Sequence, residues 1–263
     1  NRIVEPLTGR KYEFKLYPLS LAELKTIYNE LEIKRLIEKR IIFGMYPEII
    51  SENNGNLETR LKTLAKSYLY KDVLQFQNLK HAEAIDKLLQ ALALQIGSEV
   101  SYNELAGIVG LDKKTIAAYI QILERAFIIF RLTPFSRNLR NELKKLRKIY
   151  FFDNGIRNAL INNFNPAGLR QDFGALWENF VISERIKYNY NNNQEKNIYF
   201  WRTKEGREID YIEEAGGRIS AYEIKWKKEK IRTMKAFLNS YNVKEVEIIN
   251  KDNFEQFLMA QQR

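Results

Sequence analysis

Three acidic residues and one lysine have the types and spacing that metal-dependent chemistry needs. Glu178 lies in a stretch with helical periodicity, Asp210 lies in a strand-like segment, and Glu223 and Lys225 lie in the next strand-like segment. Because strand side chains alternate between the two faces, Glu223 and Lys225 are expected to point the same way. A carboxylate on one strand and Glu-x-Lys on the next can hold a hard divalent cation beside a lysine.

The same residues have a simpler interpretation. Strands often carry carboxylates and lysines at positions that face the solvent, so each residue alone is weak evidence for a site. The four residues together, in this order on these elements, are stronger evidence for how these segments fold than for a working metal site.

The elements that must position this set follow from the periodicity of the C-terminal part. We expect a helix, three strands, a second helix and a last strand, at residues 173–188, 197–201, 207–213, 218–225, 229–240 and 243–250. The asparagine-rich segment 189–194 between the first helix and the first strand is expected to be an exposed connection.

A helix-turn-helix is predicted before this region. Ser101 and Glu104 form a Ser-x-x-Glu start signal, Gly110 marks a tight turn, and Asp112 is placed to cap a second helix over 113–124. Strand-like segments at 127–132 and 148–152 flank a basic stretch, so the unit is expected to be winged.

The N-terminal part is expected to start with a strand at 11–16 and to continue with helices. Ser20 and Glu23 again form a capping box, helical periodicity continues through 31–37, and the polar segment 51–56 suggests a boundary. Further helical patterns extend from 57 to about 96.

Composition limits the classes of function. The 263 residues have a formal net charge of +10 and a sequence pI of about 9.5, which favours a polyanionic partner such as DNA, although a basic soluble protein without that partner has the same charge. The absence of cysteine excludes thiolate chemistry and disulfides, and the single histidine, His81, excludes a multi-histidine metal site. No apolar segment has the length of a membrane span, and we expect a cytoplasmic setting.

Basic and small side chains of the helix-turn-helix are candidates for contact with nucleic acid. The candidates are Lys113, Lys114, Gln121, Arg137, Arg140, Lys144, Lys145 and Arg147. Lys148 and a second group, Lys227, Lys228, Lys230 and Arg232, are further candidates for phosphate contact. The alternative is that the winged helix docks onto a protein and that these charges are solvated.

The C-terminal order of elements, with Glu in the helix, Asp in the second strand and Glu-x-Lys in the third, resembles the PD-(D/E)XK nuclease superfamily. The resemblance implies that Asp210 and Glu223 ligate Mg²⁺ or Mn²⁺ with the backbone carbonyl of Ile224. It also implies that Glu178 acts on the metal directly or through water, and that Lys225 orients the attacking water and steadies charge on the phosphate. Ile209 stands where the name of the superfamily has proline.

Nearly the whole chain resembles the C-terminal region of a prokaryotic AAA-type ATPase family that ends in a winged helix and a nuclease-like domain of unknown function. The resemblance rests on segments in fixed order, at 7–10, 17–23, 44–47, 68–72, 150–155 and 201–202, followed by the two strand motifs. It implies that the helices after Ser20 are the lid of an ATPase domain. The chain has no Gly-x-x-x-x-Gly-Lys-Ser/Thr motif, so ATP is expected to bind only in the intact parent protein.

These inferences predict an α/β protein, α+β overall, in three parts. They are an ATPase lid remnant (1–56), a winged helix-turn-helix domain (57–152) and a restriction-endonuclease-like αβββαβ domain (153–263). The leading hypothesis is a DNA-acting part of an ATP-dependent protein with a Mg²⁺-dependent phosphodiesterase site. Its own ATPase domain is the expected partner, and a homo-oligomer is a further option. The alternatives are an inactive nuclease-like module for binding or assembly, and a winged-helix regulator whose nuclease-like half only dimerises.

Overall fold

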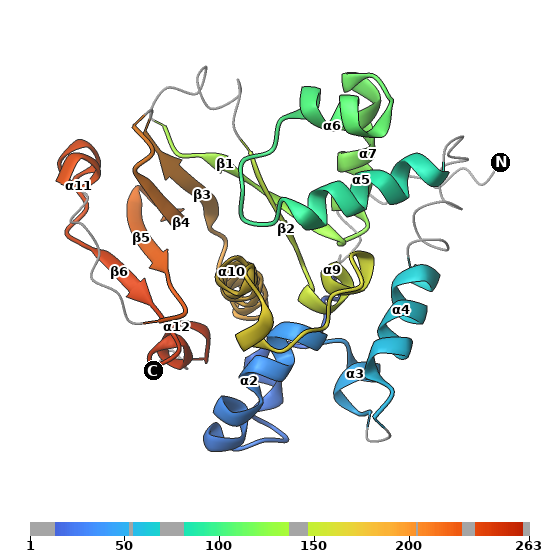
Figure 1. Ribbon diagram of the computed structural model, residues 1–263. Helices are drawn as coiled ribbons and strands as arrows, with labels where there is room; N and C mark the ends of the chain where they lie inside the picture. Colours follow the sequence, from blue (N-terminus) through green and yellow to red (C-terminus); the bar gives the residue numbers. More distant parts are fainter. Residues whose placement is uncertain are drawn as a thin grey trace, which may run out of the picture.

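A mixed six-stranded sheet organises the protein, which is α/β (Figure 1). The computed structural model describes residues 14–52, 55–68, 82–136, 147–203, 205–227 and 235–259. The strand order is β2-β1-β3-β4-β5-β6. The strands are β1 (Ile129–Pro134), β2 (Lys148–Phe151), β3 (Asn197–Arg202), β4 (Glu208–Ala215), β5 (Arg218–Ile224) and β6 (Val246–Ile249).

Both kinds of strand pairing occur in the sheet. β3, β4 and β5 form an antiparallel meander, and β6 returns parallel to β5 after the helix α11 (Lys235–Tyr241). At the other edge, β1 pairs antiparallel with β2 and parallel with β3. The strands predicted on both sides of residue 153 therefore belong to one sheet. The three-part division of the chain stays a prediction.

Helices cover the two faces of the sheet, and each face has its own core. The larger core includes Trp177 and Phe180 of α10 (Phe173–Asn191) with Tyr211 and Tyr222 of the sheet, and α12 (Phe254–Met259) packs beside α10. A smaller core gathers around Phe237 of α11 on the sheet residues Ile209, Ile212 and Ala221. The alternation of apolar side chains along β4 and β5 supplies both cores.

The predicted helix-turn-helix elements are present. The Ser101 hydroxyl accepts the N–H of Glu104 at the start of α6 (Tyr102–Val109), and Gly110 ends that helix with a φ of +78°. Asp112 caps α7 (Lys113–Arg125) through the N–H groups of Lys114 and Thr115. Figure 1 shows α6 and α7 beside α5 (Ala82–Leu94), far from β6. These contacts establish the helix pair and not the winged-helix fold as a whole.

The N-terminal helices pack onto the same core. They are α1 (Leu21–Leu24), α2 (Glu30–Phe43), α3 (Pro47–Ile50) and α4 (Leu57–Tyr68), and the short helix α9 (Asn154–Leu160) contacts α2 and α4. Ser20 and Glu23 form the predicted capping box. Glu184 of α10 accepts the N–H of Leu21 at 2.7 Å, so a buried carboxylate ties α1 to α10.

One predicted strand is wrong in the part that the structure describes. Residues 14–16 of the expected strand 11–16 form no strand. No described strand pairs with them, and Phe14 and Leu16 are 86% and 93% exposed, so neither ladder bonds nor burial favours a strand there. Residues 11–13, and His81 likewise, lie outside the described residues. None of the helices that the structure describes has the length and apolar character to cross a membrane.

Candidate functional site

Glu178 projects from the second turn of α10 toward the strand β2. Its Oε1 accepts a hydrogen bond of 2.6 Å from the Tyr150 hydroxyl and one of 3.2 Å from Lys148 Nζ. The side chain of Glu178 is 13% exposed, and Lys148 is almost completely buried. The next residue, Asn179, pairs with the backbone of Phe151 through both atoms of its amide, at 2.7 and 2.9 Å. The strand β2 is therefore held against α10 at the level of Glu178.

Asp210 and Glu223 lie opposite each other where β4 and β5 stop pairing. The backbone pairing ends at Tyr211 with Tyr222, and one step further in that register places Asp210 against Glu223. The Asp210 carboxylate accepts the N–H of Ile224 at 2.8 Å. Both carboxylates are about 4% exposed. Beyond the end of the ladder, the Asp210 side chain thus replaces a backbone carbonyl as the acceptor for β5.

The Lys225 ammonium bridges these two carboxylates. Its Nζ lies 3.0 Å from Asp210 Oδ2 and 3.1 Å from Glu223 Oε2. The prediction that Glu223 and Lys225 point the same way is confirmed, because each contacts the other, while Tyr222 and Ile224 belong to the core.

Two further residues belong to the site and were missed from the sequence. Lys148 forms ion pairs with Glu178 and with Glu208, whose side chain is 22% exposed. Lys148 was expected at a phosphate-contacting surface, and this expectation is wrong because the residue is 2% exposed beneath the acids. The signal available in the sequence was a lysine at the start of an entirely apolar strand, and Glu208 two residues before Asp210. We call the group of Lys148, Glu178, Glu208, Asp210, Glu223 and Lys225 the acid–lysine site.

The site carries more negative than positive charge. Four carboxylates and two ammonium groups give a formal charge of −2 when all are ionised. Burial, and then the nearby Asp210 carboxylate, raise the pKa of Glu178 to about 7 against the opposing effect of Lys148. The same two causes raise the pKa of Glu223 to about 7 against the opposing effect of Lys225. Near neutral pH, protons therefore compensate part of the excess charge.

The pKa values of the two lysines of the site and of the neighbouring Tyr150 are also raised. Burial alone lowers the pKa of Lys148 and of Lys225, but the surrounding carboxylates outweigh burial and raise both values above the usual range. Burial and Glu178 raise the pKa of Tyr150 well above its usual value. Both ammonium groups and the phenol hence stay protonated at neutral pH.

The donors of the site fit a hard divalent cation in type and charge, because carboxylate oxygens suit Mg²⁺ and two negative charges are in excess. Their present arrangement differs from a metal site. Across the described ranges, no three acidic or histidine side chains gather in a way that would hold a metal ion. The physical reason is visible in the contacts, since ammonium groups stand between the acids at both ends of the site.

A hollow of about 680 Å³ opens onto the site. Glu178, Ile224 and Lys225 line it on one side, and the segment 167–174 before and at the start of α10 lines it on the other. Lys225 is 35% exposed, so its ammonium is the cation of the site that solvent reaches most easily. Small solutes reach Glu178 and Lys225 from this hollow.

The candidate nucleic-acid contacts are placed only in part. Lys113, Lys114 and Gln121 lie on the exposed side of α7, as the sequence predicts. Arg147 lies over the Tyr102 ring, with 4.5 Å between the guanidinium carbon and the ring centroid. The other candidates, Arg137, Arg140, Lys144, Lys145, Lys228, Lys230 and Arg232, lie outside the described residues.

Two families of unknown function match the chain. Residues 34–167, just over half of the 263 residues, match a family described as "Domain of unknown function (DUF8612)". Residues 173–259 match a second one, described as "Domain of unknown function (DUF4143)". The first match contains Lys148, and the second contains the four acids and Lys225, so the acid–lysine site joins the two matched regions.

Curated relatives carry no assigned function. An uncharacterized protein of Haemophilus influenzae is 24% identical over 215 residues, which are 78% of this chain and 51% of the relative. An uncharacterized protein of Mycobacterium tuberculosis is 26% identical over 69% of this chain and 41% of its own length. One of Methanocaldococcus jannaschii is 23% identical over 73% of this chain and 38% of its own length. The chain thus spans about half or less of these relatives. No solved structure matches it.

Proposed function

The chain belongs to the family described as "Domain of unknown function (DUF8612)", and from that premise we propose that it is the C-terminal part of an ATP-dependent protein that acts on DNA. In this proposal, the helix pair α6–α7 contacts DNA as part of a winged helix. The acid–lysine site hydrolyses phosphodiester bonds with Mg²⁺ or Mn²⁺. The observation that carries the proposal is the meeting of Glu178, Asp210, Glu223 and Lys225 at one place beside a hollow.

Asp210 and Glu223 would hold the divalent ion with the backbone carbonyl of Ile224, and Glu178 would act on it directly or through water. A divalent ion in such a site stabilises charge on the phosphate and lowers the pKa of bound water. The excess charge of −2 supports this assignment, because it would balance the +2 charge of the ion. The Lys225 ammonium has to leave its position between Asp210 and Glu223, and its partial exposure allows that movement.

The lysines of the site have different roles in this proposal. Lys225, once released, faces the hollow and is placed to donate hydrogen bonds to a phosphate oxygen or to the attacking water. Lys148 is too deeply buried to reach a substrate. It holds Glu178 and Glu208 in place and limits the repulsion between the acids.

The parts of the proposal outside this site have other support. The ATP-dependent part rests on the resemblance to the AAA-type ATPase family, and the greater length of the relatives leaves room for such a domain in them. DNA as partner is supported by the net charge of +10 and by the exposed side chains of Lys113, Lys114 and Gln121 on α7.

Metal binding and DNA cleavage by an isosteric pair of variants test the proposal. Calorimetric titration with Mn²⁺ should show one site with a Kd in the millimolar range or below, and a DNA fragment should be cleaved in Mg²⁺ or Mn²⁺. Asp210→Asn removes a proposed ligand and should abolish both. Glu214→Gln changes an acid of the same strand outside the site and should leave both unchanged. Metal binding that survives Asp210→Asn would refute the assignment.

A second candidate function is a non-catalytic module for DNA binding or assembly. It is favoured by the two lysines, which already neutralise half of the acid charge and bridge the acids without a metal. In that case DNA should bind at low salt with the same affinity in EDTA and in Mn²⁺, and no metal-loaded form should cleave it. Absence of DNA binding would leave assembly with the ATPase domain or with a further copy of the chain.

A further inference from the structure

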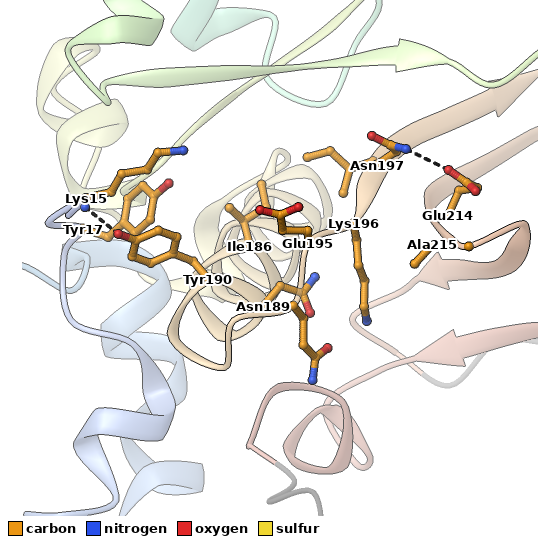
Figure 2. A pocket seen from close by; sticks show the side chains of 13 residues that line it. Lys15, Tyr17, Ile186, Asn189, Tyr190, Glu195, Lys196, Asn197, Glu214 and Ala215 are labelled. Carbon is orange, nitrogen blue, oxygen red and sulfur yellow. Dashed lines mark hydrogen bonds between the residues drawn. The ribbon is translucent and has the colours of Figure 1, made fainter. Parts of the chain in front are cut away.

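A second cavity, of about 490 Å³, lies at the opposite end of α10 from the acid–lysine site. Asn189 lines it and follows Glu178 by 11 residues, which is roughly 16 Å along a helix. Figure 2 shows Lys15, Tyr17 and Tyr190 on one side of the cavity, and Asn197 and Glu214 on the opposite side. Its volume lies within the range of small-molecule sites.

The amide of Asn189 has one atom that lacks a partner. Its Nδ2 donates a hydrogen bond of 2.8 Å to Glu213 Oε1. Since a carboxylate only accepts, this bond determines which atom of the amide is the oxygen. The residue is 6% exposed, and its Oδ1 has no hydrogen-bond partner among the described residues. A buried acceptor without a partner is costly in a folded protein, and it indicates a donor that binds there.

A free donor lies in the same cavity. Gln194 Nε2 is buried and has no hydrogen-bond partner in the described part of the chain. The backbone N–H of Gln194 donates to the carbonyl of Asn189 at 2.8 Å, so the two residues are joined at the end of α10. The Glu213 carboxylate that accepts from Asn189 also forms ion pairs with Arg185 and Lys196, each at 2.7 Å. These ion pairs fix the carboxylate and therefore the orientation of the Asn189 amide.

The walls of the cavity suit a flat ring. The rings of Tyr17 and Tyr190 meet at 90° with their centroids 5.4 Å apart, and Ile186 and Ile198 add half-buried apolar surface. The Tyr190 hydroxyl accepts the N–H of Lys15 at 2.6 Å, which holds this side of the cavity together. The Lys15 ammonium lies over the Tyr190 ring, 5.8 Å from the ring centroid. It has no carboxylate partner among the described residues, so it can also attract an anionic group at the rim.

From these features we propose that the cavity binds an amino-bearing nucleobase, adenine or cytosine, either as a free nucleotide or as one base of a single strand. The exocyclic amino group donates to Asn189 Oδ1, and the adjacent ring nitrogen accepts from Gln194 Nε2. Adenine and cytosine present this donor next to this acceptor. The ring packs on Tyr190 and the isoleucines, and Lys15 meets the phosphate.

Matched nucleotides test the hydrogen-bonding pattern on the unmodified 263-residue chain. AMP should bind measurably in calorimetric titration, and IMP, in which a carbonyl replaces the amino group, should bind at least tenfold more weakly because Asn189 Oδ1 then faces an acceptor. CMP should exceed UMP in the same way. Equal binding of AMP and IMP, or no binding of either, would overturn the proposal.

Variants and oligonucleotides locate the site and identify the source of the base. Gln194→Glu keeps the shape but replaces the donor and should weaken AMP at least tenfold, whereas Glu195→Gln at the exposed rim should not. Asn189→Leu should abolish the preference for AMP over IMP, with thermal unfolding as the check that it folds. If oligo(dA) binds more tightly than AMP and Gln194→Glu loses this binding, the site takes a base of a single strand. If AMP binds more tightly than oligo(dA), the site takes a free nucleotide. If Gln194→Glu binds AMP as tightly as the unmodified chain does, the assignment of the site is refuted.

Discussion

The carboxylate of Asp153 accepts the backbone N–H of Met45 at 2.6 Å, although the two residues are 108 positions apart in the chain. The same carboxylate caps α9 through the N–H of Ile156, and it is buried. Two of the segments that carry the family resemblance, 44–47 and 150–155, therefore form one contact. This contact joins the N-terminal helices to the sheet.

Gly44→Ala should destabilise the protein strongly. Gly44 has a φ of +80°, and a Cβ there would overlap the Asp153 carboxylate, so the substitution costs both backbone strain and a buried hydrogen-bonded acid. We expect a loss of about 3 kcal/mol or more in the free energy of unfolding by urea. Gly55→Ala is the matched control, since Gly55 has a φ of +79° with nothing within 4 Å. Equal losses in the two variants would show that the contact with Asp153 contributes nothing.

Lys148→Met should leave the acids of β4 and α10 without their buried counter-ion. Removing one partner of a buried ion pair costs about 3–5 kcal/mol, and this cost should appear in urea unfolding at pH 8, where the acids tend to ionise. Lys113→Met on the exposed side of α7 should change stability by no more than about 0.5 kcal/mol. A similar small effect in Lys148→Met would contradict the ion pairs with Glu178 and Glu208.

Stability should fall as the pH rises toward neutrality. The folded-state pKa of Glu178 and of Glu223 is raised from 4.5 to about 7, so the folded state binds more protons than the unfolded state in this interval. The stabilisation from each protonated acid is complete below pH 4.5 and is lost as the pH rises through about 7, by up to about 3 kcal/mol per group. Unfolding free energies between pH 5 and pH 8, without divalent ions, measure this slope.

The variant Glu178→Gln/Glu223→Gln provides the control for the pH dependence. Neither glutamine titrates, so the slope between pH 5 and pH 8 should become much flatter, and stability at pH 8 should increase relative to the unmodified chain. A slope that is unchanged in the double variant would assign the pH dependence to other groups.

Asn179→Leu should separate β2 from α10. The Asn179 amide pairs with the N–H and the carbonyl of Phe151, and it also donates to Asn154 Oδ1 at 2.6 Å. Leucine has a similar size but leaves two buried backbone groups unpaired, at about 1–3 kcal/mol each. Thermal unfolding should show the loss, while Asn191→Leu at the exposed end of the same helix should unfold as the unmodified chain does.

Much of the fold can be predicted from the sequence because its signals are local. Caps at Ser20, Ser101 and Asp112 and the turn at Gly110 are predicted and present, since each depends on residues within one turn of a helix. The helix at 173–188 and the meander over 197–225 appear within a few residues of the predicted bounds. By contrast, α9 and α12 are not predicted, because short helices carry too few periodic positions.

The sequence by itself determined four residues of the candidate site, because alternation along β5 and the order of the elements restrict where their side chains point. They are Glu178, Asp210, Glu223 and Lys225. Only the tertiary structure decided that Lys148 and Tyr150 reach Glu178, and that β1 pairs in parallel with β3. These contacts join residues far apart in the chain. Their partners are selected by burial and by the satisfaction of buried polar groups, which depend on the packed chain as a whole and leave no periodic pattern in any one segment.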